Sequence, residues 1–111
     1  MSVTWIVELL DARVRDELEA LPADMKARFR RIVELIQGYG LEHMGEPHVK
    51  HLEGALWEMR ITGKDGISRA IYVTAKGRRV VVVRVFVKKT QKTPRREIDL
   101  ALERAKAVNE R

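Results

Sequence analysis

The fold of this chain is decided by the stretch Val80-Val81-Val82-Val83-Arg84-Val85-Phe86-Val87, which leads directly into Lys88-Lys89-Thr90-Gln91-Lys92-Thr93-Pro94-Arg95-Arg96. The apolar run is rich in β-branched valine, is too short to cross a bilayer and carries a charge in its middle. It therefore predicts a central sheet strand rather than a membrane span. Five of the nine residues from Lys88 to Arg96 are Lys or Arg, and none is acidic. We expect a buried strand that ends in a basic rim, where an anion would bind.

The length and composition of the whole chain favour one soluble domain covering residues 1–111. The sequence contains no cysteine, which excludes disulfides, thiolate metal ligands and thiol nucleophiles and is in keeping with a reducing cytoplasm. No apolar segment approaches the length of a membrane span, and no secretory signal is visible. We expect a cytoplasmic protein that folds by packing alone and has no membrane partner.

The positive charge is concentrated in one segment. The chain carries a formal net charge of +6, yet residues 60–96 hold twelve Lys or Arg against a single acid, Asp65. That segment alone is +11, and the other 74 residues sum to −5. A patch of this kind attracts polyanions, and its phosphate contacts release counterions from nucleic acid. The charge pattern therefore predicts a nucleic-acid partner, with a merely solvated basic face as the alternative.

Hydrophobic periodicity predicts a helical hairpin in the first third of the chain. Residues 5–10 form a short β-prone run that begins the sheet. Asp11 is placed to cap a helix with an apolar stripe at i, i+4 and i+7, and Pro22 separates it from a second helix that ends at Gly38. Residues 39–56 lack clear periodicity and are interpreted as a loop.

Three β-prone runs follow, at residues 56–62, 68–75 and 79–87, and short turns between them predict an antiparallel meander. Thr93 is then placed to cap a closing helix with Pro94 at its first position. The predicted class is α+β: a small antiparallel sheet, made of the short N-terminal strand and the meander, packed against the helical hairpin, with a C-terminal helix. Within the sheet, Trp57 and Phe86 are expected to be core residues rather than base-stacking platforms.

The three histidines lie in the predicted loop, at His43, His48 and His51. No regular framework would bring them together, whereas metal sites need fixed ligand geometry. We therefore expect neither a metal site nor a cofactor.

Three segments resemble a known toxin superfamily. They are Leu56-Trp57-Glu58-Met59-Arg60-Ile61, Arg69-Ala70-Ile71-Tyr72, and Phe86 to Pro94 with Glu97 following. The chain resembles the RelE/ParE toxin superfamily and looks most like its phage-derived HigB-like branch. The resemblance implies a RelE-like fold and a toxin of a type II toxin–antitoxin system. It implies as partners a cognate antitoxin, often a helix-turn-helix protein in this branch, together with the ribosome and mRNA.

The activity that the resemblance implies is ribosome-dependent, metal-independent cleavage of mRNA, which inhibits translation. In this reaction a ribose 2′-hydroxyl attacks the adjacent phosphate, so proton transfer and stabilisation of a dianionic phosphorane are needed. Two alternatives stay open. The first is a non-enzymatic ParE-like inhibitor of gyrase, and the second is a plain nucleic-acid-binding module.

The site residues are carried over from the resemblance. Arg60 and Arg69 fall on the basic positions of the family's second and third strands, where guanidinium groups suit phosphate geometry. Lys88 and Lys89 fall on its basic cluster and are expected to bind RNA or exchange a proton. The basic segment lacks the histidine or aspartate of some family members, so Glu58 and Tyr72 are the further catalytic candidates, with Glu58 alternatively a surface partner of Arg60. The residues expected to bind RNA around them are Lys64, Arg84, Gln91, Lys92, Arg95 and Arg96.

Overall fold

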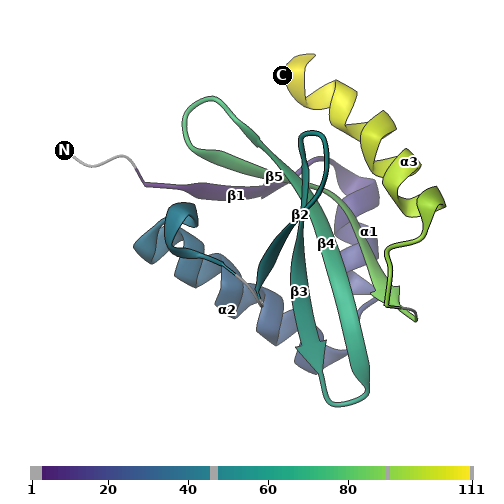
Figure 1. The fold of residues 1–111 in the computed structure, drawn as a ribbon. Helices are drawn as coiled ribbons and strands as arrows, with labels where there is room; N and C mark the ends of the chain where they lie inside the picture. Colours follow the sequence, from purple (N-terminus) through teal and green to yellow (C-terminus); the bar gives the residue numbers. More distant parts are fainter. Residues whose placement is uncertain (1–3, 46–47, 90, 111) are drawn as a thin grey trace.

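The computed structural model describes residues 4–45, 48–89 and 91–110, and it confirms the α+β class (Figure 1). In chain order the elements are β1 (Ile6–Leu9), α1 (Ala12–Glu19), α2 (Ala23–Tyr39), the 3₁₀ helix η1 (Leu41–His43), β2 (Val49–Glu53), β3 (Leu56–Gly63), β4 (Gly66–Ala75), β5 (Arg79–Lys88), α3 (Arg95–Ala105) and the 3₁₀ helix η2 (Lys106–Glu110).

The five strands form one sheet in the order β1-β5-β4-β3-β2. The antiparallel meander β3-β4-β5 is confirmed. Two details differ from the prediction. β1 pairs with β5 in parallel, because the helical hairpin carries the chain from one end of the sheet to the other before the meander begins. β2 lies in the segment interpreted as a loop and pairs antiparallel with β3. A five-residue edge strand with mostly polar side chains gives little sequence signal.

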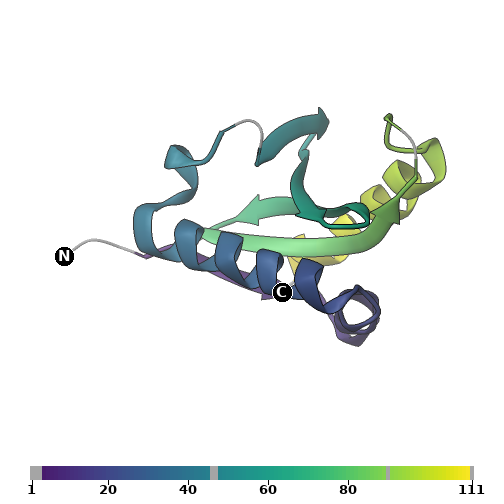
Figure 2. The same ribbon diagram turned by 90° about the horizontal axis from the view of Figure 1, so that it is seen from below.

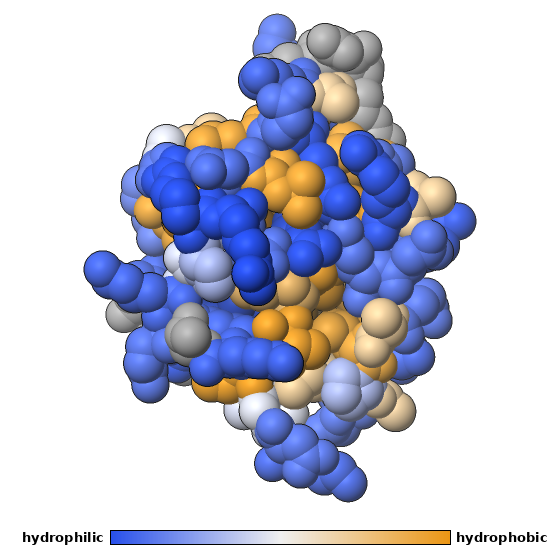
Figure 3. All heavy atoms as spheres, turned by 90° about the vertical axis from the view of Figure 1, so that its right-hand side faces the viewer, coloured by the Kyte–Doolittle hydropathy of each residue, from blue (hydrophilic) through white to orange (hydrophobic). Residues whose placement is uncertain are grey.

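β5 is the central strand that the valine run predicts. It lies between β1 and β4, and its residues Val80 to Val83 are completely buried. The helical hairpin covers one face of the sheet, and α3 lies on the opposite side from α2 (Figure 2). A space-filling view from the side of α3 shows a mainly hydrophilic surface with smaller apolar areas between the polar side chains (Figure 3). None of the described helices is long and apolar enough to cross a membrane.

The helix boundaries agree with the sequence-based predictions at some ends and differ at others. Asp11 caps α1 as predicted, and its side chain accepts hydrogen bonds from the backbone N–H groups of Arg13 and Val14. α2 runs one residue beyond Gly38, and the turn is made by Gly40 at φ +96°. The prediction that Thr93 caps α3 is wrong, since Pro94 is the N-cap residue and makes no side-chain cap bond. The Thr93 hydroxyl bonds Glu58 instead.

Candidate anion-binding site

The four basic residues predicted to form the core of the site line one pocket. Arg60 comes from β3, Arg69 from β4, and Lys88 and Lys89 from the end of β5. The pocket has a volume of about 420 Å³ and is completed by Gly66, Ile67 and Gln91. The structure therefore brings together residues that are up to 29 positions apart in the sequence.

The strand register explains this clustering. Arg60 lies directly opposite Arg69, and Ile67 lies directly opposite Lys88. Directly opposed residues share a face of a sheet, and alternate residues along a strand share it too. Arg60, Arg69 and Lys88 therefore lie on the same face, whereas the helical hairpin covers the other.

A buried ion pair links Arg69 of the pocket to Glu58. Glu58 and Arg69 are each only 3% exposed, and Arg69 Nη1 donates to Glu58 Oε1 over 2.9 Å. The second carboxylate oxygen, Oε2, accepts a hydrogen bond from Thr93 Oγ1 at 2.7 Å. The alternative that Glu58 is a surface residue pairing Arg60 is therefore wrong. Because both of its oxygens are engaged, Glu58 holds the Arg69 side chain in place.

Arg69 also has an unsatisfied donor. Its Nε is buried and has no hydrogen-bond partner among the described residues. A buried donor without a partner costs free energy, so native proteins rarely leave one unless a ligand or water meets it. Although Arg69 is buried, it still lines the pocket. The orphaned N–H is a donor that a bound anion could satisfy.

The cations in the pocket perturb one another. Burial lowers the pKa of Arg69, and the neighbouring charge of Arg60 lowers it further, against the opposing effect of Glu58. Burial also lowers the pKa of Lys88, with Arg69, Arg60 and Lys50 adding to the effect and Glu58 opposing it. Closely placed cations in a partly desolvated pocket favour an anionic ligand, which would relieve their mutual repulsion. A lysine whose pKa is lowered is also better suited to proton transfer.

Two features make the pocket more strongly positive than the sequence indicates. Arg60 is half-buried and forms no salt bridge within the described part of the chain. Lys50, on β2, lies directly opposite Glu58 and therefore on the pocket face, close enough to affect the pKa of Lys88. The sequence interpretation missed Lys50 because it assigned residues 39–56 to a loop.

Tyr72, one of the predicted catalytic residues, lies apart from this pocket. It is directly opposite Trp57, on the face of the sheet that carries the helical hairpin, and it lines a different pocket. Tyr72 is only 2% exposed, and burial raises the pKa of its phenol. The structure therefore does not bring Tyr72 together with the cationic pocket, because its parity in β4 is opposite to that of Arg69.

Two of the arginines expected to bind RNA are engaged in ion pairs. Arg84 contacts Glu97 of α3 at 2.6 Å and Glu17 of α1 at 2.8 Å, and these pairs raise its pKa. Arg95 contacts Glu53 at 2.7 Å, and hydrogen bonds to carboxylates raise its pKa as well. Arg84 thus joins both helical layers to β5. Its assignment to RNA is corrected, because its charge is already neutralised by two carboxylates.

The remaining residues expected to bind RNA are placed differently. Gln91 lines the cationic pocket, whereas Lys64 lines a separate pocket with residues of α2. The side chains of Lys64, Lys92 and Arg96 are exposed, as electrostatic contact with a long anion requires. The backbone N–H of Lys64 donates to Asp24 Oδ2 at 2.8 Å, which fixes the β3–β4 turn against α2.

The predictions for the two aromatic residues have different outcomes. Phe86 is 9% exposed, which confirms its assignment to the core, but Trp57 is 40% exposed and its assignment there is wrong. Trp57 lies near the start of β3 and makes an edge contact with the His51 ring, with centroids 5.0 Å apart. Over residues 4–45, 48–89 and 91–110, no group of three metal-ligating side chains is present.

Comparison with known families gives one match that covers most of the chain. The family described as "Phage derived protein Gp49-like (DUF891)" matches residues 16–106. No curated protein matches the chain significantly.

Two solved structures share the fold. The chain is similar to a mutant of the E. coli toxin RelE in the free state, with a TM-score of 0.65 and 13% identity over 91% of this chain and 97% of that one. It is also similar to an archaeal RelE–RelB complex from Pyrococcus horikoshii OT3, with a TM-score of 0.57 and 22% identity over 78% of this chain and 97% of that one. At these identities the likeness shows a RelE-like fold.

Proposed function

The chain belongs to the family of phage-derived Gp49-like proteins, and on this premise we propose that it is the toxin of a type II toxin–antitoxin system. We further propose that it is a HigB-like endoribonuclease that cuts mRNA on the ribosome and so inhibits translation. The RelE-like fold supports this proposal. The observation that carries it is the cluster of Arg60, Arg69, Lys88 and Lys89 in one pocket, with a buried Arg69 N–H left unpartnered.

The proposed reaction needs no metal. The 2′-hydroxyl of a ribose loses its proton to solvent water as its oxygen attacks the adjacent phosphate, the bond to the 5′ oxygen of the next nucleotide breaks, and a cyclic phosphate forms. Charge builds up on the phosphate oxygens in the transition state, and preorganised donors at that position lower the barrier. Arg60 and Arg69 would supply these donors. Lys88, whose pKa is lowered by burial and neighbouring cations, would protonate the departing 5′ oxygen.

Glu58 has a positioning role in this scheme. Its oxygens accept from Arg69 and from Thr93, so it orients the guanidinium without meeting the substrate. Lys89 and Gln91 would hold the RNA at the mouth of the pocket, and Lys64, Lys92 and Arg96 would attract the flanking phosphates. The proposed setting is the cytoplasm, with mRNA and the ribosome as targets and a helix-turn-helix antitoxin as the neutralising partner.

Mapping of transcript 5′ ends after brief induction tests the proposal. The wild type should produce new 5′ ends inside translated messages. Arg60→Ala should abolish them, because Arg60 lines the pocket and has no salt bridge to lose with any residue that the structure describes. Arg15→Ala is the matched control, since Arg15 is an exposed arginine on α1 that does not line the pocket. Growth arrest with intact messages would overturn the proposal, and so would cleavage that persists in the Arg60 variant.

A second candidate is a non-enzymatic toxin that binds nucleic acid or a topoisomerase. The scarcity of proton-transfer groups favours it. Both oxygens of Glu58 are engaged in hydrogen bonds, and Tyr72 lines a pocket on the other face of the sheet. This leaves Lys88 to transfer protons. Purified protein separates the two candidates. Salt-sensitive RNA binding without any product on programmed ribosomes would indicate a binding module, and inhibited DNA supercoiling would indicate a gyrase inhibitor.

A further inference from the structure

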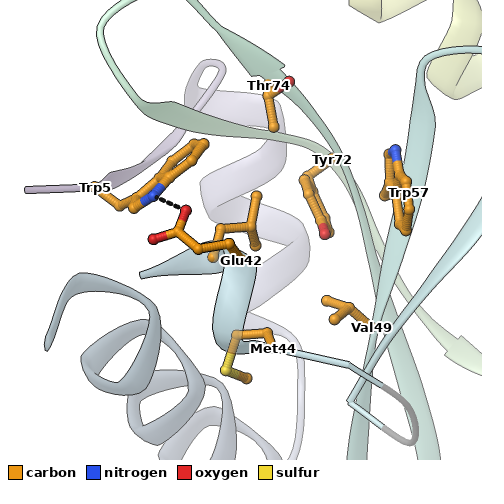
Figure 4. A pocket seen from close by; sticks show the side chains of 8 residues that line it. Trp5, Glu42, Met44, Val49, Trp57, Tyr72 and Thr74 are labelled. Atoms are coloured by element: carbon orange, nitrogen blue, oxygen red, sulfur yellow. Dashed lines mark hydrogen bonds between the residues drawn. The ribbon is translucent and has the colours of Figure 1, made fainter. Parts of the chain in front are cut away.

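A second pocket lies on the opposite face of the sheet from the cationic one (Figure 4). Its volume is about 380 Å³. It is formed where η1 and the residue before β1 meet the exposed ends of β2, β3 and β4. Its lining is mostly apolar and aromatic and consists of Trp5, Leu41, Glu42, Met44, Val49, Trp57, Tyr72 and Thr74. The proposed function uses none of these residues.

The pocket contains one fixed negative charge. Glu42 Oε2 accepts a hydrogen bond from the Trp5 indole Nε1 over 3.0 Å. That hydrogen bond is the main cause of a lowered Glu42 pKa, and the charges of Arg78 and His43 add to it. Gly40, at φ +96°, turns the chain here and leaves space for this carboxylate, since a Cβ at Gly40 would contact Glu42 Oε1. Glu42 is therefore an ionised, oriented group at the pocket.

The pocket also contains an unpartnered phenol. Tyr72 is only 2% exposed, and its hydroxyl has no hydrogen-bond partner among the described side chains and backbone groups. Figure 4 shows the hydroxyl pointing into the pocket. A phenolic hydroxyl that faces an open pocket bonds water there, and a ligand group can take the place of that water. Burial raises its pKa, and the phenol therefore stays neutral and can accept or donate.

We propose that this pocket binds an arginine side chain presented by a protein partner. A guanidinium group would pair with Glu42, donate to the Tyr72 hydroxyl and stack on an indole ring, while its aliphatic stem lies along Met44 and Val49. RNA does not fit, because the carboxylate repels phosphate. The inference is independent of the proposed function, which uses the other face.

The chain offers a direct reporter of this pocket. It has two tryptophans, Trp5 and Trp57, and both line the pocket. Indole fluorescence and the two indole N–H resonances therefore report binding there. The probe is the blocked tripeptide acetyl-Leu-Arg-Leu-amide, and the matched control is the same peptide with citrulline, which keeps the shape of arginine and removes its charge. A third peptide carries lysine in place of arginine.

Titration of the full chain should shift both indole signals saturably with the arginine peptide, in the millimolar range. The citrulline and lysine peptides should each bind at least about tenfold more weakly, a difference of about 1.4 kcal/mol. Glu42→Gln should remove the preference for arginine over citrulline. Tyr72→Phe, which keeps the ring, should weaken arginine binding, and the indole spectrum of each free variant verifies its fold. Absence of any shift, or equal binding of the arginine and citrulline peptides, would overturn the inference.

Discussion

Replacing Glu58 with alanine should destabilise the protein strongly. The carboxylate and the Arg69 guanidinium each have side chains only 4% exposed, and they lie 2.9 Å apart. Removal of one partner leaves an uncompensated buried charge, which typically costs about 3–5 kcal/mol. The lost hydrogen bond from Thr93 adds about 1 kcal/mol. The attraction within the intact pair offsets a large desolvation cost, so the same loss is not expected when both partners are replaced.

The interaction energy of the pair can therefore be measured with a double-mutant cycle, which compares Glu58→Met, Arg69→Met and the double variant. Each single variant should lose several kcal/mol of unfolding free energy. The double variant should recover most of that loss, since replacing a buried pair by apolar side chains is often near neutral. Urea is the suitable denaturant, because guanidinium salts would screen the charges being measured. Glu58→Gln, which keeps the shape and the polar atoms, is the conservative control.

The reasoning fails if Glu58→Ala costs less than about 1 kcal/mol, the range expected for an exposed salt bridge. It also fails if the single losses simply add in the double variant, because additivity would mean that the two side chains do not interact. Either result would remove the positioning role assigned to Glu58 and would leave Arg69 free to adopt another orientation.

Three further predictions concern single positions. Thr93→Val should cost about 1 kcal/mol in urea unfolding, because it removes the hydroxyl donor to Glu58; an unchanged midpoint would contradict the contact. Burial and neighbouring cations hold the Lys88 pKa below its usual 10.5 in the folded state, so the unfolded chain binds more protons in the interval below that value. Unfolding free energy should therefore rise with pH there, and Lys88→Met should flatten that slope. Gly40→Ala should cost about 1–3 kcal/mol, since φ is +96° and the new Cβ would collide with Glu42; a neutral calorimetric result would refute the strained turn.

Much of the fold is predictable from local patterns. The valine run of β5 is buried at the centre of the sheet, and the turns between the last three strands produce the meander. The apolar periodicity of the helical hairpin and the cap at Asp11 are also local properties, because they depend on residues only a few positions apart. The parallel pairing of β1 and the edge strand β2 were not predictable in this way, since each depends on a partner strand far along the chain.

The candidate site likewise has some features that the sequence predicts and others that only the tertiary structure shows. The sequence by itself determined that the positive charge would gather between residues 60 and 96. The register of β3 and β4, which places Arg60 opposite Arg69 on one face, came only from the structure. Only the tertiary structure decided which cations stay available. Arg84 meets Glu17 and Glu97 across 67 and 13 positions, whereas Arg60 meets no carboxylate among the described residues. The physical reason is that a charge is neutralised by groups within a few ångströms, and those neighbours are set by register and packing rather than by order along the chain.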